Sequence, residues 1–394
     1  MRGFVFLQNP REAKKYGIAA LTVLLIFALF PMGVCAGSLP ALSEETADEK
    51  SGSTAERDYL AELEAAIPEE YRQAFSDSDT ETLVGAEYLF SLAADSIRKE
   101  GGRALSLLAM LVGIVVLGSV ATLLTQEEKS GMRGAVSLLI TAVSAIAVYG
   151  ALAGTVKRVG AYLGDLLHFI NGASPVLTAL LAAGGSVGAA NASAGAFSLG
   201  ALLLENLLIG VLTPLAGVCT ALALIGVISP ELKPDGITRN VRWVYMTLLG
   251  VASTLAGAGL ALQTTIAAAG DSLAMRSAKY AVGSMIPLVG GSIGSALGTL
   301  TASLATVKSV VGVSGVAVLL LMTLPVLVYL LLTRLAVSVA GAVAGLFGFS
   351  AGEKLLAEFR RLFDMLLAMT AAAGVTFMIY FAVFLKVAYP AAIS

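Results

Sequence analysis

Residues 184–190 read GGSVGAA, and residues 290–296 repeat the pattern as GGSIGSA. A proline precedes each copy, Pro175 in the first case and Pro287 in the second, and long apolar stretches lie on both sides. Glycine spaced in this way lets helices approach one another closely. The two copies predict a duplicated, closely packed element inside a membrane protein with two related halves.

The composition indicates that lipid surrounds much of the chain. The mean hydropathy is +0.86, and 57% of the residues are hydrophobic while 13% are charged. Soluble domains carry about 25% charged residues. A chain this apolar therefore belongs to the class of membrane proteins.

Charge is distributed unevenly along the chain. Residues 37–100 hold 16 acidic and 5 basic residues, whereas residues 101–394 hold 10 acidic and 16 basic residues. The pattern predicts an acidic, water-exposed region joined to a weakly basic membrane body. Nucleic acid is not expected as a partner because no long basic patch is present to neutralise phosphates. Cys35 lies in a segment expected to be removed, and the one remaining cysteine with one histidine is a poor start for a zinc site, so neither metal nor other cofactor is expected.

The N-terminal residues 1–36 resemble a secretory signal peptide. A basic start is followed by the apolar run YGIAALTVLLIFALF over residues 16–30, and small residues precede a cut after Ala36. The alternative is an uncleaved first transmembrane helix. A lipoprotein anchor at Cys35 is disfavoured because Val34 is bulkier than the small residue expected there.

Residues 37–102 are expected to form an acidic extracytoplasmic helical region. Residues 37–55 have too few large apolar groups to fold alone, and residues 56–76 give helical signals around Pro68. A helical stripe follows at Leu83, Ala86, Leu89, Phe90, Ala93 and Ile97. It either lies on the membrane surface or a partner, or it belongs to a small self-packed helical cap.

Six later segments hold the roughly 20 apolar residues that a membrane crossing needs: 103–124, 134–154, 197–228, 243–268, 312–349 and 362–388. The first two would form a transmembrane hairpin over residues 103–155. The segments 197–228 and 312–349 exceed one crossing and contain Pro214 and Pro325, which predicts tilting, kinking or a break.

The pattern changes before each glycine copy. Residues 156–170 place apolar side chains on one face and charged ones on the other, which predicts an interfacial helix, and residues 270–284 are a weaker second copy. Each would lead into a helical hairpin that enters the membrane and returns, facing protein or a cavity because exposed backbone cannot face lipid.

These observations predict an all-α polytopic membrane protein with about six to eight transmembrane segments. Two glycine-rich re-entrant hairpins would lie in a parallel internal repeat, a known way to build transport proteins, and a small helical ectodomain would precede it. Repeat 1 would cover residues 156–268, repeat 2 residues 269–388, and a tail residues 389–394. The segments NVRWVYMTLLGVAS (240–253) and EFRRLFDMLLAMTA (358–371) support the repeat.

Orientation follows from lysine and arginine in short loops, which favour the cytoplasmic side. The loops 125–133, 229–242 and 350–361 all carry such residues and would lie inside, with residues 37–100 outside. If each glycine hairpin crosses the membrane instead of re-entering, the number of spans rises to about eight.

The glycine copies supply the first set of candidate site residues, which either pack helices or line a pore. They are Gly184, Gly185, Ser186, Gly188, Gly290, Gly291, Ser292, Gly294 and Gly298. Each copy also matches G-x-S-x-G, but a hydrolase needs a base beside the serine. His168 is the single histidine, and no phosphate-binding P-loop occurs, so no catalytic residue is expected.

Glu205, Asn206 and Arg334 are the polar candidates inside apolar segments. An intramembrane carboxylate points to function by default, although Glu205 near the interface would simply reach water. Glu205 precedes Pro214 by nine residues and Arg334 follows Pro325 by nine. Equivalent helices would separate the two by about 27 Å in depth, so a direct pair is not expected.

Taken together, the chain resembles the stage III sporulation protein AE family of endospore-forming bacteria. The resemblance rests on the signal-like start, the ectodomain with EEYRQAF, the GGSVGAA and GGSIGSA copies, and the late stretch GEKLLAEFRRLFDMLLAM. It covers nearly the whole chain, and the order of the parts carries it.

The resemblance implies a non-enzymatic subunit of the channel or secretion-like complex that connects the mother cell to the engulfed forespore. The subunit would lie in the mother-cell membrane around the forespore, with its ectodomain between the two membranes. Implied partners are the other stage III A proteins, including a secretion-type ATPase, and a forespore membrane protein. The alternative is a stand-alone secondary transporter with a site near the hairpins and Glu205.

Overall fold

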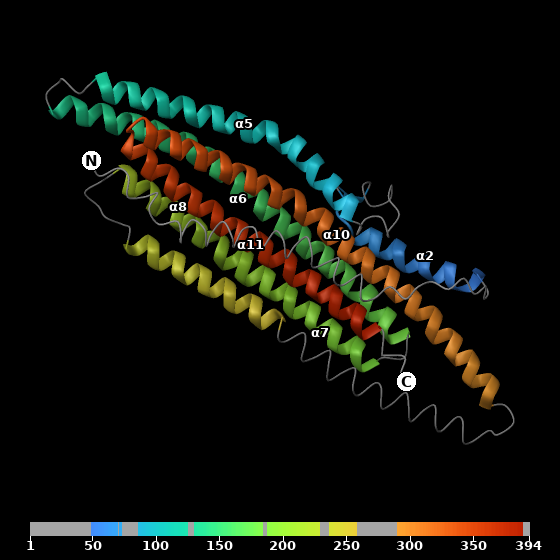
Figure 1. The fold of residues 1–394 in the computed structure, drawn as a ribbon. Helices are drawn as coiled ribbons and strands as arrows, with labels where there is room; N and C mark the ends of the chain where they lie inside the picture. Colours follow the sequence, from blue (N-terminus) through green and yellow to red (C-terminus); the bar gives the residue numbers. More distant parts are fainter. Residues whose placement is uncertain are drawn as a thin grey trace.

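The computed structural model is an elongated bundle of helices (Figure 1). Every element among the residues that the structure describes is helical, which confirms the predicted all-α class. The described residues are 49–69, 71–72, 86–124, 130–183, 187–228, 236–257 and 290–388.

The helices follow one another along the bundle in alternating directions. They are α2 (Glu49–Ala66), α5 (Ala86–Leu124), α6 (Ser130–Ala183), α7 (Val187–Leu203), the π-helix η1 (Leu204–Leu212), α8 (Thr213–Ile228), a helix over residues 236–257, α10 (Gly290–Leu346) and α11 (Ser350–Ala388). The three helices α7, η1 and α8 follow one another without a break and form a single rod. α10 and α11 are joined by a short connection in which Gly348 has a φ of 71°, a conformation that favours glycine.

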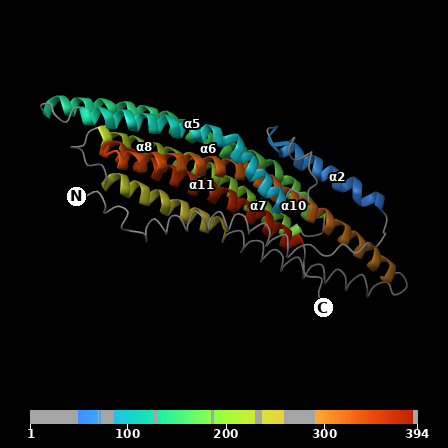
Figure 2. The same cartoon turned by 45° about the horizontal axis from the view of Figure 1, so that its top comes forward.

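Different helix termini meet at the two ends of the bundle (Figures 1 and 2). One end, here called the loop end, gathers the C-termini of α5, α8 and α10 and the N-termini of α6, α11 and the helix over 236–257. The opposite end, here called the α2 end, carries α2 and the junction of α6 with α7. The described parts of the three basic segments expected in the cytoplasm all lie at the loop end. Residues 130–133 begin α6 and residues 236–242 begin the helix over 236–257. Residues 350–361, expected as a loop, instead form the first turns of α11.

Several helices are long and apolar enough to cross a membrane. The spans are Tyr88–Ala121, Ala142–Ala183, Phe197–Gly226, Val310–Leu346 and Ser350–Phe381. α6 has 54 residues and α10 has 57, which gives lengths of about 80 and 85 Å at 1.5 Å per residue. The hydrocarbon core is only about 30 Å thick, so the bundle is far longer than a bilayer crossing requires.

α6 corrects the prediction of a separate interfacial helix over 156–170. The helix runs without a break from Ser130 to Ala183 and passes through Pro175. Its apolar face is buried inside the bundle, with Tyr162 and Phe169 at 2% and 0% exposure. The predicted amphipathic pattern is therefore real, but the apolar face meets protein and not lipid. α5 is a continuous helix across residue 102, and the division of the chain into domains stays a prediction.

The two glycine copies lie in different surroundings. Residues 290–296 are helical and form the first turns of α10, so this copy is not itself a turn. Of the first copy, residues 187–190 begin α7, whereas Gly184, Gly185 and Ser186 lie outside the described residues, as do Pro287 and the segment 270–284. The predicted re-entrant hairpins and internal repeat stay predictions.

An aromatic cluster joins α6, α7 and α11 toward the α2 end. The rings of Phe169 and Phe197 both contact Phe381, with centroids 5.9 and 5.7 Å apart, and Phe197 also meets Tyr380 edge-on. Gly200 faces the Tyr380 ring and Gly315 faces the Phe381 ring so closely that any side chain there would clash. Glycine therefore sets how near α7 and α10 approach α11.

The rod formed by α7, η1 and α8 changes its hydrogen bonding just before Pro214. Thr213 donates its backbone N–H to the Leu208 carbonyl, five residues back, and its hydroxyl donates to the same oxygen at 2.9 Å. Proline has no N–H to continue the α-helical pattern. The wider π-turn accommodates this loss, so the helix continues past the proline instead of ending.

α2 packs against the α2 end of the bundle. Leu63 and Ile67 are fully buried, and Ala66 lies against Gly172 of α6, where a Cβ would be 2.5 Å from the Ala66 Cβ. In the stripe predicted around residues 83–97, Phe90 and Ile97 are 77% and 50% exposed. Leu89 packs against the core, however, so the described part of the protein covers this stripe only in part.

Candidate functional site

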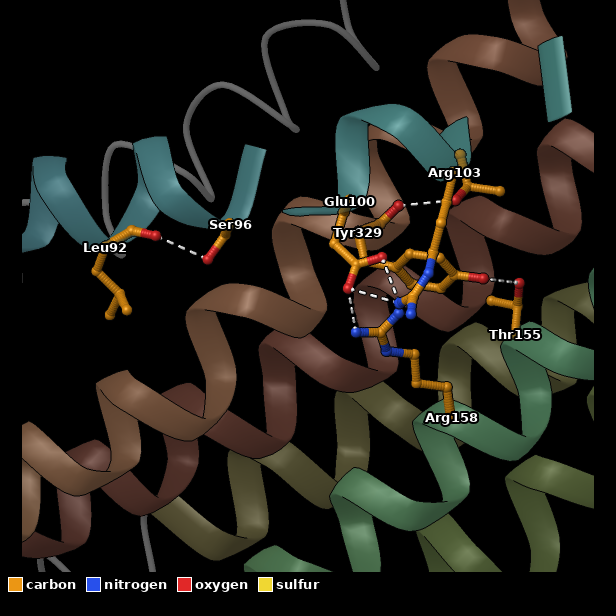
Figure 3. Close-up of polar contacts among 8 residues, drawn as sticks. Leu92, Ser96, Glu100, Arg103, Thr155, Arg158 and Tyr329 are labelled. Atoms are coloured by element: carbon orange, nitrogen blue, oxygen red, sulfur yellow. Dashed lines mark hydrogen bonds and ion pairs between the residues drawn. The ribbon is translucent and has the colours of Figure 1, made fainter. Parts of the chain in front are cut away.

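Glu100 lies at the junction of three helices and organises the polar cluster shown in Figure 3. Its side chain is 7% exposed. Arg158 of α6 donates to it at 2.5 Å, and Arg103, one turn further along α5, donates to both carboxylate oxygens at 3.2 Å. A buried carboxylate is costly unless it is paired, and here two guanidinium groups supply the pairing.

Tyr329 of α10 completes the cluster from the third helix (Figure 3). The Arg158 guanidinium carbon lies 4.3 Å from the centroid of the Tyr329 ring, within range of a cation–π interaction. The Tyr329 hydroxyl is 3.0 Å from Thr155 Oγ1, which itself donates to the Ala151 carbonyl. Because the Thr155 proton is used, Tyr329 is the donor. The cluster therefore fixes α5, α6 and α10 to one another at a single level.

A second polar contact joins α6 and α10 about two turns away. The hydroxyls of Tyr162 and Thr323 are 3.0 Å apart, and Thr323 donates to the Leu319 carbonyl, so Tyr162 is the donor. Gly374 of α11 lies opposite, where a Cβ would be 2.6 Å from Thr323 Cγ2. This pair fixes the register of α6 and α10 inside an otherwise apolar core, because shifting either helix would leave a buried hydroxyl unpaired.

Toward the loop end, ion pairs connect α11 to its neighbours. Glu358 accepts from Arg242, in the helix over 236–257, at 2.9 Å and also from Arg361. Arg334 of α10 pairs with Asp364 of α11. These side chains are one fifth to two fifths exposed, so the charges reach partly out of the bundle. They act as contacts between helices at this end.

Charged residues gather at the level of Glu100. On α5 they are Asp95, Arg98, Lys99 and Arg103, and on α6 they are Lys157 and Arg158. From Arg103 to Leu124, the end of α5, the helix rises about 32 Å, which equals one hydrocarbon thickness. Large exposed apolar side chains follow within that distance on α5 at Leu105, Met110, Leu117 and Val120. Beyond this level α6 continues for another 25 residues to Ala183.

The predicted polar candidates occupy separate places. Arg334 lies in the ion pair with Asp364, not near Glu205. Glu205 and Asn206 begin η1 and are exposed, with the Asn206 amide donating to the Leu202 carbonyl at 3.0 Å. Among the described residues Glu205 has no side-chain partner. Of the glycine candidates, Gly188 is exposed near the start of α7, and Gly290, Gly291, Ser292, Gly294 and Gly298 lie in the first turns of α10.

A small cavity lies between η1, the helix over 236–257 and α11. Its walls are apolar apart from Ser253 and Thr376, and its volume is about 30 Å³. That volume has room for water only, whereas small-molecule sites measure about 300–1,000 Å³. Among the described residues, no group of three or more His, Cys, Asp or Glu side chains could hold a metal ion.

Sequence reasoning missed the partners that make the clusters, namely Glu100, Tyr329 and Asp364. One signal was available for Glu100, because α5 and α6 form an antiparallel hairpin. Glu100 lies 24 residues before the end of α5 and Arg158 lies 28 residues after the start of α6. In an antiparallel hairpin, residues at similar distances from the connecting loop lie side by side. The side chains of Glu100 and Arg158 are therefore expected within about one helical turn of each other. Asp364 stands as a lone carboxylate in the apolar stretch RRLFDMLLAM.

Comparison with known proteins connects this arrangement to a sporulation family. Residues 79–388 match the profile of the family described as stage III sporulation protein AE. A Bacillus subtilis (strain 168) protein named stage III sporulation protein AE is 28% identical over 159 residues. The matched part spans 39% of this chain and 39% of that relative. No solved structure matches the chain.

Proposed function

Since the chain belongs to the stage III sporulation protein AE family, whose membership implies a role in sporulation, we propose that it is a membrane subunit of a transport complex. The complex would connect the mother cell to the forespore, with this chain in the mother-cell membrane around the forespore. The family is one of sporulation membrane proteins and is not a known enzyme family. The subunit would accordingly do no chemistry of its own.

The length of the bundle carries this proposal. α6 and α10 measure about 80 and 85 Å, against about 30 Å of hydrocarbon. The charged residues near Glu100 would mark the outer boundary of the bilayer, and the loop end would lie in the cytoplasm because its loops are basic. The α2 end would then project tens of ångströms into the space between the two membranes.

A projecting bundle suits a subunit that must meet partners across that space. We propose that these partners are the other stage III A proteins, including a secretion-type ATPase at the loop end, and a forespore membrane protein at the α2 end. The basic loops and the exposed Leu346 and Phe347 at the loop end, 85% and 53% exposed, would be available to a cytoplasmic partner.

The stand-alone transporter is the competing proposal. Among the described residues, the cavity near η1 does not support it, because its volume of about 30 Å³ is far below the roughly 300–1,000 Å³ of small-molecule sites. The continuous packing around Phe381 also fills the centre of the described bundle with aromatic rings.

Two experiments on the full chain test the proposal. In a spore-forming host that lacks its own copy, the forespore should stall after engulfment, and the full chain should restore development. A tagged chain purified from sporulating cells should bring the other stage III A proteins with it. Purified alone in proteoliposomes, the chain should not move small solutes. Saturable solute uptake by the chain alone, or normal spores in its absence, would refute the proposed role.

A further inference from the structure

Glu205 and Lys157 both point outward from the bundle and have no partner among the described residues. Glu205 lies at the start of η1, and on the same rod of α7 and η1 Leu199 and Leu202 are each 50% exposed and Val211 is 43% exposed. Lys157 lies on the exposed stripe of α6, which is formed by Gly150, Gly154, Lys157, Ala161 and Gly164. This stripe faces away from the Glu100 cluster that holds the neighbouring Arg158. The exposed apolar side chains near Glu205 gain from being covered, and a partner that covers them must also supply a counter-charge to the carboxylate.

The two charges lie at similar levels along the bundle. Phe169 of α6 and Phe197 of α7 both contact Phe381, so they define one level. Glu205 is eight residues beyond Phe197, and Lys157 is twelve residues before Phe169, both toward the loop end because α6 and α7 are antiparallel. At 1.5 Å per residue these offsets are about 12 and 18 Å. The difference of about 6 Å is within the reach of a lysine side chain.

The outward face of α6 around Lys157 allows a second helix to approach closely. Gly150, Gly154 and Gly164 lie on this exposed stripe, and a Cβ built at any of them would meet nothing within 4 Å. The glycines that pack helices inside this protein, such as Gly200 and Gly374, are by contrast already in contact. The spacing of Gly150 and Gly154 is that of helix pairs in membranes.

We infer that two copies of this chain associate in parallel through these faces, with Glu205 of each copy opposite Lys157 of the other. Copies in the same membrane have the same orientation. A rotation axis along the membrane normal leaves the depth of every residue unchanged, so residues at the same depth meet across the interface. A two-fold axis forms the pair twice. Since α6 packs against α7, η1 and α8, Lys157 and Glu205 lie on neighbouring helices of each copy. This inference is independent of the proposed role in transport.

The test uses the full chain in nanodiscs, with Cys35→Ser and Cys219→Ala removing the native thiols. The wild-type chain should be dimeric by native mass spectrometry. Glu205→Lys should weaken the dimer by about threefold to thirtyfold, the range for polar contacts between membrane helices, and Lys157→Glu should do the same. The double variant Glu205→Lys/Lys157→Glu should regain the wild-type dimer fraction. A dimer fraction that is unchanged in both single variants, or the absence of a dimer in the wild type, overturns the inference.

Disulfide cross-linking between single cysteines tests the interface without changing any charge, so misfolding of the charge variants does not affect it. Because the inferred interface places α6 of one copy against η1 of the other, Ala161→Cys should be co-expressed with a second chain that carries Leu202→Cys. Each of these exposed positions can then form a disulfide only with another copy, and the mixture should give a covalent dimer on oxidation. Leu335→Cys, on the outward face of α10 and 52% exposed, is the matched control and should stay monomeric. Equal cross-linking of the mixture and the control, or none of the mixture, contradicts the proposed interface.

Discussion

Breaking the Glu100–Arg158 pair should destabilise the junction of α5, α6 and α10. Glu100→Gln keeps the shape of the side chain and removes its charge, which leaves the Arg158 guanidinium, 32% exposed, without a counter-ion. Removing one partner of a fully buried pair costs about 3–5 kcal/mol. Hydrogen bonds to charged groups contribute about 1.5–3 kcal/mol.

The partial exposure of Arg158 selects the lower part of this range. Arg103 adds little because its side chain is 70% exposed, and the Tyr329 ring still stabilises Arg158 after the change. We therefore expect Glu100→Gln to lower the free energy of unfolding by about 2–3 kcal/mol. This corresponds to an unfolding equilibrium constant raised about 30- to 150-fold.

A double-mutant cycle in mixed detergent micelles measures the pair directly, with helix content followed during unfolding by dodecyl sulfate. Glu100→Gln, Arg158→Gln and the double variant should give a coupling energy of about 1–3 kcal/mol. Asp95 and Arg98 of the same helix are the control, since their charges are 3.9 Å apart and 63% and 84% exposed. That pair should couple by less than about 0.5 kcal/mol. A coupling for Glu100 and Arg158 as small as the control value would refute the reasoning.

Three further predictions concern single contacts in the bundle. Tyr329→Phe should cost about 1 kcal/mol through the lost hydrogen bond to Thr155, while Tyr329→Leu should cost more because Arg158 also loses the aromatic ring; equal unfolding midpoints would contradict this. Gly374→Ala should lower the free energy of unfolding by about 1–3 kcal/mol because its Cβ would overlap Thr323. Gly217→Ala, with open space around it, should be neutral or stabilising. Equal shifts of the two melting temperatures would rule out the packing explanation. Asp364→Asn should destabilise the protein by about 1–3 kcal/mol by leaving Arg334 unpaired, but Arg334→Met/Asp364→Leu should be nearly neutral; a double variant less stable than Asp364→Asn would show that the charges themselves are needed.

Helical periodicity predicted the helices well because it depends on local spacing. The apolar positions of residues 156–170 were assigned to one face correctly, and Val159, Leu163 and Leu166 are all buried. Periodicity does not say what covers an apolar face, however, and bilayer and protein satisfy it equally. The prediction of an interfacial helix was wrong for this reason, since α10 and α11 supply the cover that lipid was expected to supply.

The candidate site was harder to predict because it depends on contacts between distant residues. Glu100 and Arg158 are 58 residues apart and Thr155 and Tyr329 are 174 apart. Lone charges in apolar segments were recognised at Glu205 and Arg334, but the partner of Arg334 lies on the next helix, at Asp364. Glycine patterns were less informative, because glycines with and without packed neighbours look identical in sequence. Gly374 and Gly217 differ only in what the fold places beside them.

If the bilayer ends near Glu100 while the bundle continues beyond it, positions along α5 should lie at different depths. Phe90, Leu105 and Leu117 are 77%, 66% and 71% exposed on the same helix, α5. Labels at these three positions therefore differ in depth and not in how far the protein buries them. Phe90 and Leu117 are about 40 Å apart along the helix, more than the hydrocarbon thickness. Spin labels at single cysteines in nanodiscs should be accessible to oxygen at positions 105 and 117, and to a water-soluble nickel complex at position 90. A label at position 90 as deep in lipid as the one at position 105 would contradict the account.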